Sequence, residues 1–139
     1  MRLFVDTSIF VDCLKRDVVS ASESFLKSLQ GVNTGFASVI TVAELSVGAY
    51  LSPRKDALKK TLDLLTPVIL IDVDKAIAVE GGRIYSSLVK SGGEIELNDC
   101  LIAASAISVG IEEVVTRNTK HFERIESIRA VTPEELGFE

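Results

Sequence analysis

Short apolar runs alternate along the chain with longer segments of helical period, and this alternation limits the folds open to it. It predicts an α/β fold with a mainly parallel sheet, because parallel strands are buried on both faces and are joined by helices. We expect about five strands: Leu3 to Asp6, Gly35 to Ser38, Val68 to Ile71, Val114 to Thr116 and Arg129 to Val131. The length of 139 residues predicts a single domain over residues 1–139.

The segments between these runs have the spacing of amphipathic helices. One apolar stripe is formed by Leu58, Leu62 and Leu65, and a second, on a longer helix, by Ile77, Ile84, Tyr85 and Leu88. The segment from Cys100 to Val109 is apolar nearly all round and stops at Gly110, which predicts a deeply buried helix with a glycine cap. Gly81 and Gly82 lie inside the longer helix and indicate a kink or a close backbone contact.

The charge and the hydrophobic pattern exclude several classes of protein. A net charge of −5 argues against a protein that coats nucleic acid by bulk electrostatics. No apolar run reaches the roughly 18 to 20 residues needed to cross a bilayer, and an acid interrupts the start of the chain, so we expect a cytoplasmic protein with no membrane partner. Cys13 and Cys100 have no metal-binding spacing and are expected to be buried thiols.

Three acidic residues stand near expected helix starts, and each has two interpretations. Asp6 ends the first expected strand, where ligands gather at the edge of a parallel sheet, but an Asp there can equally cap the next helix. Glu44 can face the same edge or form a capping box with Thr41. Asp99 can cap the apolar helix, stabilise its dipole, or be a buried carboxylate that needs a counter-charge.

The combination of these acids favours a metal site. No nearby lysine can neutralise all three, and hard divalent cations prefer carboxylate oxygens. Such an ion can polarise a phosphodiester and activate water, so that no protein nucleophile is needed. The chain has one histidine, His121, which we expect to be structural or at the surface, and it has no Ser/His/Asp arrangement or glycine-rich phosphate motif. Metal-assisted hydrolysis is the reaction class that these residues predict.

Four segments, taken in order, resemble those of PIN-domain nucleases. They are Phe4 to Ser8, Ile40 to Leu45, Asn98 to Ala104 and Val115 to Asn118. The resemblance spans essentially the whole chain and is strongest to single-domain VapC-type toxins of toxin-antitoxin pairs. It implies a Rossmann-like three-layer α/β/α PIN fold, dependence on Mg²⁺ or Mn²⁺, and endonucleolytic cleavage of RNA by a single PIN-like nuclease domain.

The resemblance also implies roles for individual residues. Asp6, Glu44 and Asp99 match the three acids that bind metal and carry catalysis, and the expected supporting residues are Thr7, Ser8 and Thr116. Asn118 stands where a fourth acid is often found. An amide can orient a water molecule but adds no charge, so we expect one tightly held ion, with Asn118 in a catalytic role.

Partners follow from the same resemblance. Arg117 and Lys120 lie beside Asn118 and are candidates for contact with RNA phosphate. A second basic group, which we call the α-linker cluster, consists of Arg54, Lys55, Lys59 and Lys60 and is either a phosphate contact or a solvated face. A homodimer is implied, to which Pro53 to Thr66 could contribute, together with a cognate antitoxin protein.

Two other functions stay open. A phosphoacceptor receiver domain also has a doubly wound sheet with Mg²⁺ at its strand ends, and Asp72 and Thr116 fit it superficially. It needs an acidic pair after the first strand and a lysine after the fifth, where this chain has Asp6 alone and Val131-Thr132-Pro133. A non-catalytic interaction domain would keep the fold and use the acids only as helix caps.

Overall fold

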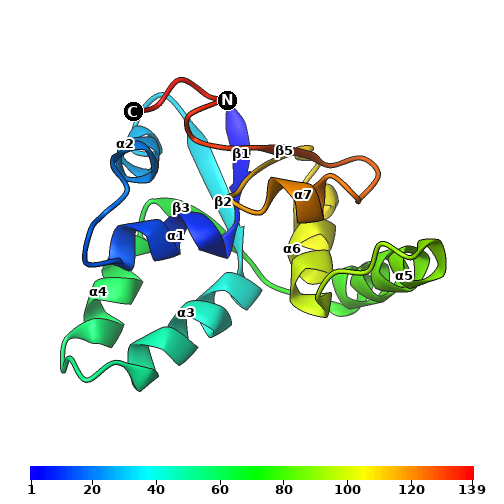
Figure 1. The fold of residues 1–139 in the computed structure, drawn as a ribbon, viewed down its shortest axis with the longest axis horizontal. Helices are drawn as coiled ribbons and strands as arrows, with labels where there is room; N and C mark the ends of the chain where they lie inside the picture. Colours follow the sequence, from blue (N-terminus) through cyan, green and yellow to red (C-terminus); the bar gives the residue numbers. More distant parts are fainter.

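A five-stranded parallel sheet forms the centre of the computed structural model, which describes residues 1–139 (Figure 1). The strands are β1 (Arg2–Val5), β2 (Thr34–Ser38), β3 (Val68–Ile71), β4 (Glu113–Val115) and β5 (Arg129–Val131). They lie in the order β3-β2-β1-β4-β5, and all neighbours are parallel. The predicted sheet is confirmed. The bounds of β3 and β5 are as predicted, and those of β1, β2 and β4 differ from the predicted bounds by one residue.

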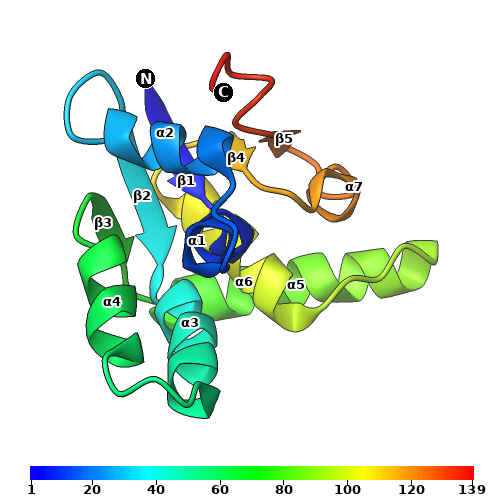
Figure 2. The ribbon, with the colours of Figure 1, turned by 60° about the vertical axis from the view of Figure 1, so that its left-hand side comes forward.

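Helices cover both faces of this sheet. They are α1 (Thr7–Leu14), α2 (Ser20–Ser28), α3 (Val39–Leu51), α4 (Ala57–Leu64), α5 (Lys75–Ser91), α6 (Leu97–Ser108) and α7 (Thr119–Phe122). Helices α1 to α4 lie on one side, and α5 to α7 lie on the other (Figures 1 and 2). This arrangement confirms the three-layer α/β/α fold. Helices α2 and α7 were not among the predicted elements.

The strands are apolar without interruption because both of their faces are buried. Side chains of β1 alternate between the two sides of the sheet, as the period of a strand requires. Phe4 joins the core that packs against α5 and α6, whereas Leu3 and Val5 join the core beneath α1 to α4. All three are fully buried. This double burial explains why continuous apolar runs identified the strands.

Helix α6 is the most deeply buried helix, as its composition predicts, and α5 packs closely along it. A Cβ at Gly81 of α5 would lie 2.6 Å from Leu101 Cδ2, so the absence of a side chain allows the two helices to approach. Helix α5 continues through Gly81 and Gly82 from Lys75 to Ser91. A close contact, rather than a break in the helix, is therefore the reason for glycine here. Gly110, with φ of 72°, follows α6 in the left-handed conformation expected of it.

One predicted stripe is partly wrong. In α4 the buried side chain is Thr61, whose Oγ1 donates to the Ala57 carbonyl at 2.9 Å, whereas Leu62 is 47% exposed. Helix α4 lies beside β3, the edge strand, so little of the protein covers it. On β3 itself, Ile69 and Leu70 are also exposed.

Both cysteines are free thiols. Cys100 is buried as predicted, whereas Cys13 is half-buried. Burial raises the pKa of each thiol to about 11, so both are protonated at neutral pH. None of the helices combines the length and the apolar character that crossing a bilayer requires.

Gly81→Ala and Gly82→Ala form a matched pair that tests the contact between α5 and α6. Each gains about 1 kcal/mol of helix propensity, but a Cβ at Gly82 meets nothing within 4 Å, whereas one at Gly81 collides with Leu101. Overpacking costs about 1 to 3 kcal/mol, so urea unfolding should show Gly81→Ala less stable than Gly82→Ala by about 1 kcal/mol or more. Equal stability of the two variants would contradict the close packing.

Candidate functional site

The register of the two central strands brings Asp6 beside Thr116. Val5 of β1 pairs with Val115 of β4, and the Asp6 amide donates to the Val115 carbonyl at 2.9 Å. Each strand ends at this point, so Asp6 and Thr116 leave the sheet side by side. The chain adds β2 and β3 on one side of β1 and β4 and β5 on the other, which makes the β1/β4 boundary the topological switch point. Ligands of open α/β sheets bind in the crevice outside the carboxyl ends of the strands at such a point.

The same strand order excludes the receiver domain as an alternative. A receiver domain has its strands in the order 2-1-3-4-5, whereas this sheet has the order β3-β2-β1-β4-β5. The superficial match of Asp72 and Thr116 to that class therefore carries no weight.

Asp6 both caps α1 and belongs to the site. Its Oδ2 accepts hydrogen bonds from Ser8 Oγ and Thr116 Oγ1, each at 2.7 Å, and from the Ser8 amide at 3.4 Å. Its Oδ1 accepts no hydrogen bond from the protein and is not enclosed. The two interpretations of Asp6 are thus compatible, because one oxygen is held by the helix start and the strand end while the other is free.

Glu44 is placed differently from the predicted capping box. Helix α3 begins at Val39, and its cap is Ser38, whose Oγ accepts from the Ile40 amide at 3.0 Å. Glu44 therefore lies in the second turn, and Thr41 does not cap. Instead, Thr7 Oγ1 lies 2.7 Å from Glu44 Oε1, to which it donates, and 2.8 Å from Thr41 Oγ1. Ser8 supports Asp6 as predicted, whereas Thr7 supports Glu44.

Asp99 lies in the first turn of α6, and no protein group donates a hydrogen bond to its carboxylate. The residue at the cap position is Glu96, whose side chain makes no capping bond. The nearest cationic candidate is His121, with Nδ1 3.5 Å from Asp99 Oδ2. Burial, and then the negative charges of Asp6 and Glu44, raise the pKa of Asp99 to about 6. The three predicted acids are therefore close enough to repel one another.

These acids line one cavity of about 390 Å³ at the carboxyl edge of the sheet. Its walls are Asp6, Thr7, Ser8, Val11, Asp12, Lys15, Glu44, Glu96, Asp99, Arg117, Asn118 and His121. The structure thus brings together the four residues predicted to be catalytic. Thr116, which is not part of the cavity wall, donates through Oγ1 to Asp6, and the same Oγ1 accepts from the backbone amide of Asn118 at 2.9 Å. Lys120 is exposed and lies outside the cavity walls.

Several residues of the cavity were missed in the sequence. Asp12 is an acid inside the apolar stretch of α1, and this unusual position was a signal that could have identified it. Lys15, Glu96 and His121 carried no such signal. His121 is exposed, as expected, but it lies at the rim of the cavity rather than away from the site.

The lysine and arginine side chains of the cavity form ion pairs with Asp12 and not with the three predicted acids. Asp12 Oδ2 accepts from Arg117 Nε at 2.6 Å, and Lys15 Nζ lies 3.2 Å from Oδ1. Arg117 Nη1 also donates to Glu134 at 2.6 Å. No ion pair of the structure includes Asp6 or Glu44. The Arg117 guanidinium, a candidate for contact with RNA phosphate, is engaged by protein groups.

The donor set of the cavity suits a hard divalent cation. Asp6, Glu44 and Asp99 supply carboxylate oxygens without a fixed counter-charge, which is the chemistry that Mg²⁺ and Mn²⁺ prefer. No three His, Cys, Asp or Glu side chains stand close enough together to enclose an ion as they are placed. This spacing fits an ion that takes one or two carboxylates directly and keeps water on its remaining positions, as Mg²⁺ does in proteins.

A second cavity, of about 890 Å³, lies between α1, α3 and α4 and continues from the first. Val11, Lys15 and Glu44 belong to the walls of both cavities. Of the α-linker cluster, Arg54 and Lys60 line this second cavity. Arg54 and Lys59 are paired with Asp56 and Asp63, at 3.5 and 2.8 Å, on the exposed surface.

Comparisons with known proteins agree with this architecture. The PIN domain family matches residues 3–128 of the chain. Ribonuclease VapC2 of Rickettsia felis is 32% identical over 129 residues, which cover 92% of this chain and 95% of that protein. The tRNA(fMet)-specific endonuclease VapC of Shigella flexneri is 29% identical over 132 residues, covering 93% and 96%. The crystal structure of VapBC2 from Rickettsia felis bound to a DNA fragment from its promoter superposes with a TM-score of 0.81 at 29% identity, over 95% of this chain and 98% of that chain.

The raised pKa of Asp99 predicts a pH-dependent cost in stability. The folded protein holds the Asp99 proton up to about pH 6, whereas the unfolded chain loses it near 3.8. The cost of ionising the folded group is therefore absent below pH 3.8 and complete above about pH 6. We expect Asp99→Asn to exceed wild type in free energy of unfolding by about 2 kcal/mol at pH 7, and to lose this advantage near pH 4.

Asp17→Asn is the matched control, because Asp17 is exposed and outside every ion pair. Urea unfolding between pH 3.5 and 8 measures the difference for both variants. An Asp99→Asn advantage that stays constant over this range, or one shared by Asp17→Asn, would contradict the assignment of the cost to burial and repulsion of the Asp99 carboxylate within the cavity.

Proposed function

The chain belongs to the PIN-domain family, among the VapC ribonucleases, and from this membership and the geometry of the cavity we propose that it is a divalent-metal-dependent endoribonuclease. The substrate is RNA, and the reaction is hydrolysis of a phosphodiester bond. The observation that carries the proposal is the convergence of Asp6, Glu44 and Asp99 in one polar cavity, where no lysine or arginine forms an ion pair with any of the three. Asp12, by contrast, is held in an ion pair with Arg117.

The protein's own residues orient the carboxylates. Ser8 and Thr116 each donate to one oxygen of Asp6, which turns its other oxygen toward the cavity. Thr7 holds Glu44 in the same way. Hydroxyl groups donate hydrogen bonds without adding charge, so the cavity keeps its negative potential while its carboxylates are fixed in place.

Asp6, Glu44 and Asp99 are the residues that would hold the ion, which is Mg²⁺ or Mn²⁺. When bound, a divalent ion supplies charge stabilisation for the phosphate and lowers the pKa of water. Asn118 lines the cavity and its side-chain carboxamide makes no hydrogen bond within the protein, and we assign it the orientation of the attacking water. With an amide at this position, the donor set suits one tightly held ion.

The same family membership supports a toxin role with an antitoxin partner. Solved structures similar to this chain include VapBC2 from Rickettsia felis and a toxin-antitoxin complex from Klebsiella pneumoniae. The cavity between α1, α3 and α4 opens beside Glu44, so a protein seated in it would reach the carboxylates. A homodimer involving Pro53 to Thr66 and a cytoplasmic location, where RNA substrates are found, complete the proposal.

Cleavage of structured and single-stranded RNA by wild type and Asp6→Asn, with and without Mn²⁺, tests the activity. Asparagine is a good helix cap, so α1 keeps its start while the site loses a charged ligand. Several kcal/mol of charge stabilisation depend on such a site, and we expect the variant to cut at least about 100-fold more slowly. Asp17→Asn should cut like wild type. Equal rates for wild type and Asp6→Asn would refute the proposal.

Mn²⁺ binding separates the nuclease from a non-catalytic interaction domain. An ion present at about 100 times its dissociation constant stabilises the folded protein by about 2.7 kcal/mol. The thermal midpoint of wild type and of Glu112→Gln, an exposed acid outside the cavity, should rise with Mn²⁺. That of Asp99→Asn should start higher and stay constant. A wild-type midpoint that does not respond would favour the interaction domain.

A further inference from the structure

A buried ion pair lies behind the segment that supports Asp6. Asp12 is 3% exposed, and its Oδ2 accepts from Arg117 Nε at 2.6 Å and from Ser22 Oγ at 2.7 Å. Arg117 Nη2 donates to Ser22 Oγ at 2.8 Å, and Nη1 donates to Glu134 at 2.6 Å. One guanidinium therefore joins α1, α2 and the C-terminal segment, and each of its nitrogens has a protein partner.

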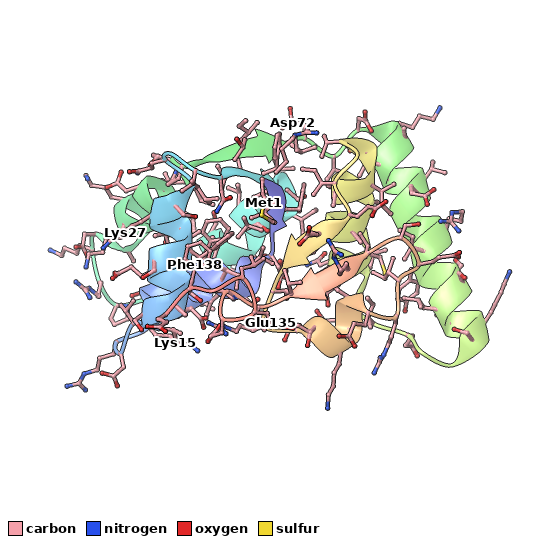
Figure 3. All side chains as sticks on the ribbon, turned by 90° about the horizontal axis from the view of Figure 1, so that it is seen from above. Met1, Lys15, Lys27, Asp72, Glu135 and Phe138 are labelled. Atoms are coloured by element: carbon pink, nitrogen blue, oxygen red, sulfur yellow. The ribbon has the colours of Figure 1, made fainter.

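The C-terminal segment is itself fixed against α2. Phe138 packs edge-on against Phe25, with ring centroids 5.5 Å apart, and lies beside α2 in Figure 3. Ser24 Oγ donates to the Glu139 carbonyl at 3.0 Å. The acceptor that Glu134 offers to Arg117 thus sits on an anchored segment.

The backbone of Arg117 connects this network to the proposed site. Its amide donates to Ser8 Oγ at 2.9 Å, and Ser8 Oγ donates to Asp6 Oδ2 at 2.7 Å. The Ser8 hydroxyl therefore uses its one proton on Asp6 and accepts the Arg117 amide on its oxygen. The residues on either side of Arg117 are Thr116, which donates to the same Asp6 oxygen, and Asn118. A displacement of this short segment would move the Thr116 donor directly and would disturb Ser8 Oγ through its bond from the Arg117 amide.

We propose that Arg117 is a positioning residue, whose ion pair with Asp12 holds residues 116–118 so that Asp6 turns its free oxygen toward the cavity. This inference rests on the proposed ribonuclease function. It replaces the expectation that Arg117 binds RNA phosphate, since the guanidinium uses its nitrogens on Asp12, Ser22 and Glu134 and the side chain is only 26% exposed.

The chemistry of the pair supports this role. Burial alone would raise the pKa of Asp12, but hydrogen bonds from Ser22 and Arg117 outweigh it and hold that pKa below its ordinary value. The carboxylate is therefore charged at neutral pH and needs its partner. A planar guanidinium can serve three acceptors at fixed angles, whereas a lysine ammonium is a single point charge on a flexible stem. Arg117→Lys keeps the charge but cannot reproduce the fork.

The test compares three variants with wild type. Arg117→Lys retains a cation for Asp12. The double variant Asp12→Asn/Arg117→Gln replaces the pair with neutral amides and leaves no unpaired buried charge. It therefore tests the loss of the ion pair even if a single substitution unfolds the protein. Arg83→Met is the control, because Arg83 is also ion-paired, with Glu80, but lies on the exposed face of α5.

Three measurements distinguish the roles. They are kcat and KM for RNA cleavage, Mn²⁺ affinity from the rise in thermal midpoint, and the salt dependence of RNA binding in EDTA. Misplacement of a reacting group by about 1 Å costs up to about 100-fold in rate, so we expect kcat to fall about 10- to 100-fold in Arg117→Lys and in the double variant. Their Mn²⁺ affinity should weaken, while KM and the salt slope stay near wild type. Arg83→Met should match wild type throughout.

A phosphate contact would give the opposite pattern. Lysine would then substitute with little loss, the double variant would raise KM with kcat unchanged, and its salt slope would fall by about 0.7 for one lost contact with single-stranded RNA. That pattern, or unchanged kcat and Mn²⁺ affinity in folded variants, overturns the inference. If wild type cuts no RNA, the proposed function fails, yet weakened Mn²⁺ affinity in Arg117→Lys still supports the positioning role. A wild type that binds no Mn²⁺ refutes both proposals.

Discussion

The in-register pairing of β1 with β4 determines where the chemistry of this protein can take place. Val5 and Val115 are partners at the ends of two buried strands, so the residues that follow them, Asp6 and Thr116, must leave the sheet together. The site then inherits the rigidity of the core, because Phe4 and Val114 are locked between helices on one face and Leu3, Val5 and Val115 on the other. Glu44 and Asp99 come from helices that begin at the same edge. A shift of one residue in this register would separate Asp6 from the hydroxyl that supports it.

Electrostatic roles are divided sharply within a small volume. The fixed cations, Arg117 and Lys15, are directed at Asp12, which has a structural use for them. The acids that face the cavity receive hydroxyl donors instead, from Thr7, Ser8 and Thr116. Burial of Asp99, and then repulsion from Asp6 and Glu44, raise the pKa of its carboxyl. Such stored repulsion is typical of a binding site, where a ligand rather than the protein supplies the missing charge.

Sequence reasoning was reliable where a local pattern reflects burial or chain direction. The apolar runs identified the five strands because both faces of the sheet are covered, and the acids were found because they stand where strands give way to helices. It did not identify the hydrogen-bond partners that come from distant parts of the chain. Thr41 and Glu44 have the spacing of a capping box, but Ser38 starts the helix earlier, and Thr7, 37 residues away, bonds to Glu44. Arg117 stood beside Asn118 and suggested a substrate contact, whereas its guanidinium binds Asp12, 105 residues away. Spacing describes neighbours on one helix or strand, and it carries no information on which distant side chain a flexible arm will meet.

The edge strand β3 has a consequence for how the protein behaves at high concentration. It pairs only with β2, leaving a row of backbone groups unpaired on its outer side, and its exposed Ile69 and Leu70 are apolar. Edges of this kind can recruit a strand from another molecule and begin aggregation. Strand β3 is only four residues long, with Pro67 directly before it and Asp72 directly after it. Short length, proline and charge are features that protect an edge strand from such pairing. Substitutions that remove Pro67 or Asp72 would leave the edge of β3 less protected against pairing with strands of other molecules.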